Sequence, residues 1–213
     1  MRGTASGTGR LIGKPMPSTR RRQPEDLQFH PVTPKRLPDL KRFSAEHGKF
    51  GYCSCMRWRL RSSDYRESSK AGRAVALYAR VREGEATGVL AYDNELPIGW
   101  CSLGPRESYA ALERYRSLPR IDDSAVWSVV CFFVDSRYRR QGLALGLLEA
   151  AVAFAASAGA HIIEGYPVEP DAKSYTYMGS PNTFRQAGFR DVTPAGQART
   201  VMRYHIETSG RSE

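Results

Sequence analysis

Residues 139–144 read RRQGLA, a short polar stretch between two strongly apolar segments. Before it, AVWSVVCFFVD (125–135) is rich in the β-branched and aromatic residues typical of a buried strand. After it, residues 143–158 are apolar on nearly every side, which indicates a buried helix that ends before Gly159. The pattern therefore predicts a strand, a tight loop and a helix in succession.

The composition of this loop indicates an anion-binding site. The first N–H groups of a helix have no partner within the helix, and the helix dipole places partial positive charge beside them. Gly142 lets the backbone approach a ligand closely, and Ala144 is too small to block it. Arg139 and Arg140 add positive charge at the same place. We therefore expect a phosphorylated ligand here; the alternative is a solvated basic connection.

The rest of the chain predicts strands and helices around this unit. Residues 88–104 form a hairpin with Asp93-Asn94-Glu95 as its turn. Ser180 and Pro181 have the residue types of a helix start, and that helix stops at Gly188. The whole order indicates one mixed α/β sheet with 125–168 as its best parallel unit. Further elements are expected as strands at 27–34, 160–168 and 199–207, helices at 34–47 and 69–83, an ambiguous segment at 51–60 and a polar connection at 105–124.

The loop, in its position between strand and helix, resembles a known signature. Arg139-x-x-Gly142-x-Ala144 is similar to the acyl-CoA motif R/Q-x-x-G-x-G/A of the GCN5-related N-acetyltransferase (GNAT) superfamily. The stretch FRQAGF (184–189) is similar to the helix end that occurs late in that family. The resemblance covers residues 27–207, loosely over 35–87. It implies a single α/β domain at 27–208, whose mostly antiparallel sheet has a central splayed parallel strand pair and flanking helices.

The resemblance also implies acetyl-CoA as acyl donor and no metal. Pantetheine would pair with the exposed main chain of Phe132, Phe133 and Val134, in the gap beside the strand at 160–168. An amine would attack the thioester directly, with a main-chain N–H near Val134 facing the oxyanion. The pyrophosphate would lie on the loop amides, which belong to Arg139, Arg140, Gln141, Gly142, Leu143 and Ala144.

The acid that protonates the leaving thiolate is less clear. The family often has a tyrosine at the position that Phe184 occupies here, and phenylalanine has no proton to donate. Either the thiolate leaves without an acid, or Tyr175 or Tyr177 reaches in from the preceding loop. We favour Tyr177 as the catalytic acid; for both tyrosines the alternative is loop packing.

The general base is equally open. Glu164 is the first catalytic candidate, because a carboxylate within the apolar strand AHIIEGYPV (160–168) requires a reason. The alternative is a glutamate at the strand end that faces solvent. Four weaker candidates are Asp122, Asp123, Glu169 and His161.

The acceptor pocket is expected between the hairpin and the early helices. Trp100 and Arg106 lie at the end of a hairpin strand, and the segment from Tyr52 to Trp58 is aromatic and contains cysteines. Arg106 could bind a substrate carboxylate or phosphate with two hydrogen bonds. The alternative assigns these residues to the core and to the surface.

Charge and cysteine content exclude other classes. Of the net charge of +10, +6 lies in the first 24 residues and +4 in the other 189, so the charge does not favour a nucleic-acid-binding domain. Residues 1–26 are expected to be a disordered basic tail, with Met16 as an alternative start after an added leader, and 209–213 a disordered C-terminus. Cys53-x-Cys55 lacks the partners of a zinc site.

These observations predict a cytoplasmic acetyl-CoA-dependent N-acetyltransferase of a small-molecule amine. Neither a membrane span nor the apolar region of a signal peptide is evident, so reduced cysteines are expected. The alternatives are a protein lysine or N-terminal acetyltransferase, an acyl-CoA-binding regulatory module without turnover, and nucleic-acid binding through the tail. The resemblance leaves a homodimer open.

Overall fold

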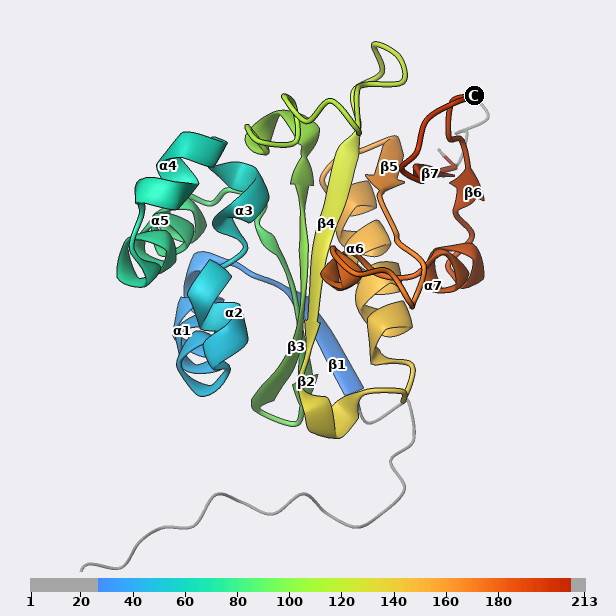
Figure 1. Cartoon of the computed structure of the whole chain (residues 1–213). Coiled ribbons are helices and arrows are strands. Elements are labelled where there is room, and N and C mark those ends of the chain that lie inside the picture. Colours follow the sequence, from blue (N-terminus) through green and yellow to red (C-terminus); the bar gives the residue numbers. More distant parts are fainter. Residues whose placement is uncertain (1–26, 208–213) are drawn as a thin grey trace, which may run out of the picture.

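The computed structural model describes residues 27–207, in which seven strands form one sheet (Figure 1). The disordered segments expected at 1–26 and 209–213 lie outside the described residues, as does Thr208. The strand order is β1-β2-β3-β4-β5-β7-β6; β4 and β5 pair in parallel and the other neighbours pair antiparallel. The predicted mixed sheet is thereby confirmed. The strands are β1 (Leu27–Pro31), β2 (Gly88–Asp93), β3 (Leu96–Pro105), β4 (Trp127–Val134), β5 (Ile162–Gly165), β6 (Arg190–Asp191) and β7 (Met202–His205).

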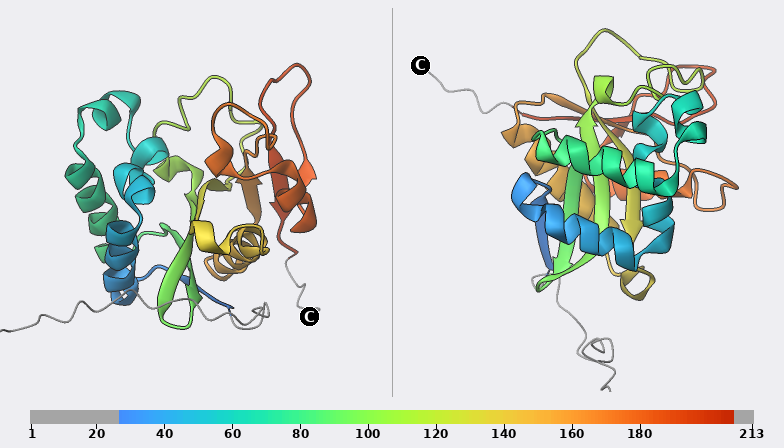
Figure 2. Two further views of the ribbon diagram at one scale, coloured as in Figure 1. Left: turned by 60° about the horizontal axis from the view of Figure 1, so that its bottom comes forward. Right: turned by 90° about the vertical axis from the view of Figure 1, so that its left-hand side faces the viewer.

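Helices cover both faces of this sheet. Five of them, α1 to α5, lie over one face, and α6 lies on the opposite face with α7 beside it (Figures 1 and 2). Within residues 27–207, no helix has the length and apolar character needed to cross a membrane. The helices are α1 (Leu37–Glu46), α2 (Gly48–Cys53), α3 (Met56–Arg59), α4 (Ser62–Glu67), α5 (Lys70–Arg82), α6 (Leu143–Ser157) and α7 (Pro181–Gln186).

The ambiguous segment at 51–60 proves to be helical and broken. Helix α2 ends at Cys53 and α3 begins at Met56, and both intervening residues, Ser54 and Cys55, have left-handed backbone angles. The turn is held by burial, because the Cys55 side chain is 3% exposed and its sulfur accepts a hydrogen bond from the indole of Trp100. This contact joins residues 45 positions apart, so the local sequence pattern could not predict the break.

Burial on both faces explains why β2 and β3 consist mostly of apolar residues on both sides of each strand. Along β2, Val89 and Ala91 pack in the cluster that contains α6. The alternate residues Leu90 and Tyr92 pack in the cluster that contains α1 and α5. The sheet is thus the middle layer of three.

The two parallel strands separate after a short contact. Only Trp127, Ser128 and Val129 of β4 pair with β5, whereas β4 continues to Val134 (Figure 1). On its other side β4 stays paired with β3 as far as Val134. The second half of β4 therefore has one edge without a neighbouring strand, as the predicted splayed pair requires.

Candidate active site

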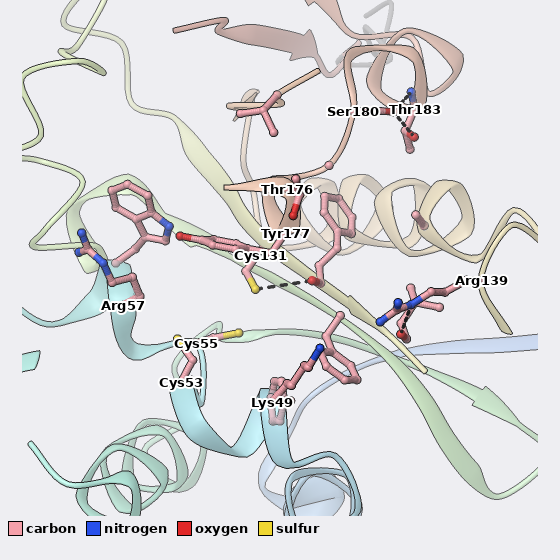
Figure 3. Close-up of a pocket in the computed structure, with 18 of the residues that line it drawn as sticks. Lys49, Cys53, Cys55, Arg57, Cys131, Arg139, Thr176, Tyr177, Ser180 and Thr183 are labelled. Atoms are coloured by element: carbon pink, nitrogen blue, oxygen red, sulfur yellow. Dashed lines mark hydrogen bonds between the residues drawn. The ribbon is translucent and has the colours of Figure 1, made fainter. Parts of the chain in front are cut away.

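The free edge of β4 lies beside a cavity of about 760 Å³ (Figure 3). Its walls come from β4, from α2 and α3, and from residues 168–183. Arg57 and Arg139 lie at opposite ends of the cavity, with Lys49 on the wall between them (Figure 3). The cavity thus runs from the loop before α6 to the first helices of the chain.

Backbone N–H groups of β4 point toward the cavity. The N–H of Asp135 donates to Ile98 on β3, 2.9 Å away. Because N–H groups alternate in direction along an antiparallel strand, those of Phe132 and Val134 point away from β3, toward the side that β5 has left. Phe132, Phe133 and Val134, all predicted to bind the cofactor, line the cavity. An extended ligand can therefore pair with β4 like an added strand.

The predicted phosphate loop has the expected backbone. Gly142 has a φ of +78°, a value that favours glycine, and a Cβ placed there would meet nothing within 4 Å. In the described chain, the N–H groups of Leu143 and Ala144 at the start of α6 have no hydrogen-bond partner. A second hollow of about 270 Å³ lies here and shares Arg139 and Ala144 with the main cavity.

Eight of the nine predicted cofactor residues line one or both of these hollows, and Gln141 is the exception. Arg140 borders the smaller hollow, and its φ of +60° is unusual for a residue with a side chain. Gln141 lies apart from both hollows, because its side-chain amide donates to the carbonyl of Arg137 at 3.0 Å. The predicted cofactor residues that line the smaller hollow are Val134, Arg139, Arg140, Gly142, Leu143 and Ala144.

Of the two candidate tyrosines, Tyr177 lines the cavity. Burial raises the pKa of Tyr177, so its phenol keeps its proton. Tyr175 turns away, since its hydroxyl forms a 2.9 Å hydrogen bond with Tyr115 and its ring lies under Arg199. Phe184 is fully buried in the core beside α6.

Glu164 lies outside the cavity, in a buried ionic cluster. Arg106 and the hydroxyl of Tyr166 both donate to its Oε1 at 2.7 Å. Arg203 donates to its Oε2 at 2.8 Å. At 1% exposure Glu164 is not the solvent-facing glutamate of the alternative interpretation. Its oxygens are engaged by cations, so the geometry gives it a structural role and does not favour it as general base.

The two predicted substrate residues also lie behind the cavity wall. Arg106 is 1% exposed and uses its guanidinium internally, on Glu113, Glu164, Tyr166 and the carbonyl of Leu118. Four of its five N–H donors are thus used within the protein, and Arg106 does not line the cavity.

Trp100 is fully buried, and its indole donates to the sulfur of Cys55 at 2.9 Å. Cys55 lines the cavity, whereas Trp100 supports it from behind. Arg106 follows the end of β3 as expected, whereas Trp100 lies in the middle of that strand, and the direction of both side chains depends on partners far along the chain.

The four weaker candidates for the general base differ in their position relative to the cavity. Glu169 is exposed and lines the cavity, whereas His161 and Asp123 are exposed away from it. Asp122 pairs with Arg203 through both of its oxygens. Glu169 is therefore the single carboxylate among the described residues of the cavity wall.

The segment 52–58 is only partly the pocket wall that was predicted. Cys53, Cys55, Arg57 and Trp58 line the cavity, but Tyr52 is 61% exposed. Burial raises the pKa of Cys53 and of Cys55, so both thiols stay protonated. Residues of the wall that sequence reasoning missed are Lys49, Phe50, Tyr65, Thr176, Ser180 and Thr183. The spacing of Lys49 and Cys53 on one helix face was the available signal.

Comparison with known proteins agrees with this geometry. Residues 53–177 match the model of the Acetyltransferase (GNAT) family. The Salmonella typhimurium protein yncA, solved with its cofactor acetyl-CoA, superposes with a TM-score of 0.52 at 15% identity, over 87% of this chain and 97% of that chain. The Drosophila melanogaster polyamine N-acetyltransferase, which forms N-acetylagmatine, gives 0.50 at 13% identity, over 84% and 100%. At these identities the structural likeness concerns the fold.

No curated protein sequence matches the chain. The family match, however, spans more than half of the 213 residues and includes β4, the phosphate loop and α6. The chain therefore belongs to the GNAT family of acetyltransferases.

Proposed function

We propose that this acetyltransferase moves the acetyl group of acetyl-CoA to the primary amine of a small molecule. The observation that carries the proposal is that three features follow one another along two adjoining hollows: the start of α6, the free edge of β4 and the end of the main cavity beside Arg57. A phosphorylated, extended donor fits the first two features. The third leaves room for an amine next to the middle of β4.

The residues of the phosphate loop fit the charged part of acetyl-CoA. Arg139 and Arg140 supply positive charge, and the N–H groups of Leu143 and Ala144 supply donors that no described residue uses. The open space beside Gly142 admits a phosphate close to the backbone. These contacts would fix the donor so that its acyl group lies beside Phe132 and Val134.

Acetyl-CoA supplies the acyl group and a thiolate as leaving group when it is bound. The N–H of Val134 then donates a hydrogen bond to the carbonyl oxygen as negative charge develops on it. Tyr177 holds a phenolic proton for the departing sulfur. Glu169 is placed to accept the proton of the attacking amine, directly or through water.

Calorimetric titration of acetyl-CoA tests the donor site. We expect micromolar binding by the native protein and its loss in Gly142→Glu, because the added carboxylate would project into the phosphate seat and repel the ligand. Gly84→Glu is the matched control: Gly84 has the same φ of +78° and the same open surroundings but does not line either hollow.

Binding that Gly142→Glu removes and Gly84→Glu preserves supports the site. Equal binding by both variants would place the pyrophosphate elsewhere. Absence of binding in the native protein would refute acetyl-CoA as the donor.

A further inference from the structure

Arg57 is held at the acceptor end of the cavity without a counterion. Its guanidinium lies 5.1 Å from the ring centre of Trp58 and 5.9 Å from that of Tyr65. Within residues 27–207 it forms no hydrogen bond or ion pair with another side chain. These aromatic contacts restrain the guanidinium and leave its N–H groups available for a ligand.

Two other arginines near Arg57 use most of their side-chain donors within the protein. Arg59, two residues further on, donates to Ser108, to Tyr109 and to backbone carbonyls. Arg73 donates to the carbonyls of Tyr52 and Ser68. Both side chains thus find acceptors within the protein, although the Nε–H of Arg59 has none. Arg57 departs from this pattern, and it does so on a cavity wall.

The charge of the cavity wall has one predominant sign. Three cations line it, Lys49, Arg57 and Arg139, against the single described carboxylate of Glu169. Arg139 belongs to the phosphate loop, so Lys49 and Arg57 remain for the rest of the hollow (Figure 3). A pocket that selects a polycation would require carboxylates in place of these two groups.

Beside Arg57, a second and independent group lacks a hydrogen-bond acceptor. The indole N–H of Trp58 is buried and has no hydrogen-bond partner in the described part of the chain, and Trp58 lines the cavity. An unsatisfied buried donor is costly, so a ligand oxygen that reaches it gains more than an exposed contact would. Phe50 and Tyr65 line the same cavity with apolar surface.

We propose that the acceptor is an amine that also carries a carboxylate, of the size of an α-amino acid, and that Arg57 binds that carboxylate. This inference rests on the proposed function and narrows its substrate class. The carboxylate, held by Arg57 at the far end from Arg139, would direct the amine toward the middle of β4 and Tyr177 (Figure 3). Amines without an anionic group, polyamines included, would lack this anchor.

Matched acceptor pairs test the inference. Acetyl transfer is followed by thiol release with L-phenylalanine against phenethylamine, L-tryptophan against tryptamine, L-leucine against 3-methylbutylamine, and with spermidine. Within each pair the apolar body is shared and the carboxylate is the difference. We expect kcat/KM to favour the amino acid by about tenfold or more in at least one pair.

Arg57→Gln should remove that preference by raising KM for the amino acid, with the decarboxylated amine little changed. Arg57→Lys should restore part of it, because the charge returns without the planar pair of donors. Arg61→Gln is the matched control: it removes the same charge nearby from an exposed side chain outside the cavity. Binding of the same amino acids to the CoA-saturated protein, measured by calorimetry, reports on recognition independently of turnover.

A preference for the amino acid that Arg57→Gln removes and Arg61→Gln retains supports the proposal. It is overturned by equal or better use of the decarboxylated amines or spermidine, by a preference that survives Arg57→Gln, or by absence of both turnover and binding for all three amino acids. The proposed function fails differently, when acetyl-CoA itself does not bind. If only the amines that lack a carboxylate are acetylated, the proposed function stands and carboxylate recognition by Arg57 is rejected.

Discussion

Gly165 and Phe184 show how closely the residues behind the site are packed. A Cβ at position 165 would lie 2.0 Å from one carbon of the Phe184 ring. That ring is fully buried and meets the edges of Phe132 and Phe189. We therefore expect Gly165→Ala to lower the free energy of unfolding in urea by about 1–3 kcal/mol, the usual cost of overpacking a core.

The control for this change is Gly48→Ala, whose added methyl group meets nothing within 4 Å. It should leave the unfolding midpoint within experimental scatter. Combining Gly165→Ala with Phe184→Leu should recover part of the loss, because a smaller side chain relieves the contact. Full stability of Gly165→Ala alone would show that the ring can move away at little cost.

Tyr177 carries the second prediction at the scale of single residues. Burial raises its pKa above the ordinary value of 10, so the phenol remains a proton donor throughout the neutral and mildly alkaline range. Tyr177→Phe should lower kcat by about a hundredfold with little change in acetyl-CoA binding, as expected for loss of a general acid. The measurement is steady-state kinetics on the best acceptor from the amine pairs.

Tyr175→Phe is the matched control, because it removes a hydroxyl that bonds to Tyr115 outside the cavity. It should retain most of the activity. A Tyr177→Phe enzyme with native kcat would mean that the thiolate leaves without an acid from this loop.

At the scale of elements, local sequence was sufficient where local residues determine the structure. The strand at 127–134, the loop with Gly142 and the helix that follows were all predicted, because apolar runs and a glycine at positive φ are properties of a short stretch. The N-cap of α7 is similar: Ser180 accepts a hydrogen bond from the backbone of Thr183. These elements contain the proposed donor site, which is why its residues could be named from local sequence.

The acceptor half depends on contacts between distant elements. The break between α2 and α3 is stabilised by Cys55 against Trp100, and Glu164 is occupied by Arg106, 58 residues earlier in the chain. Neither of these contacts can be predicted from the spacing of residues along the chain. A carboxylate in an apolar strand requires a reason, and the structure shows an ionic cluster around Glu164 in place of the expected position at the cavity. The side that such a residue faces is decided by the whole fold.

At the scale of the molecule, that cluster compensates for the separation of β4 and β5. The two parts of the sheet share only three paired residues on each strand. Arg106, just after β3, donates to Glu164 on β5, which in turn accepts from Arg203 on β7. Asp122 extends the chain of ion pairs to the connection between β3 and β4. The free edge proposed to bind the donor is thus compatible with a sheet that stays together.

The ion pairs of this cluster also determine how the free energy of unfolding changes as pH falls. Hydrogen bonds from Arg203 and Ser124 hold the pKa of Asp122 well below its ordinary value of 3.8. A carboxyl whose pKa is lowered in the folded state stabilises that state above the unfolded pKa, and loses this contribution as pH falls below it. Asp122→Asn should therefore lower the free energy of unfolding by a constant amount from pH 7 to about pH 4, with the difference from the native protein shrinking at more acid pH. Urea unfolding across this range measures it, with Asp123→Asn as control because Asp123 forms no ion pair within the described chain. A difference that stayed constant down to pH 2 would show that Asp122 acts through its shape and not through its charge.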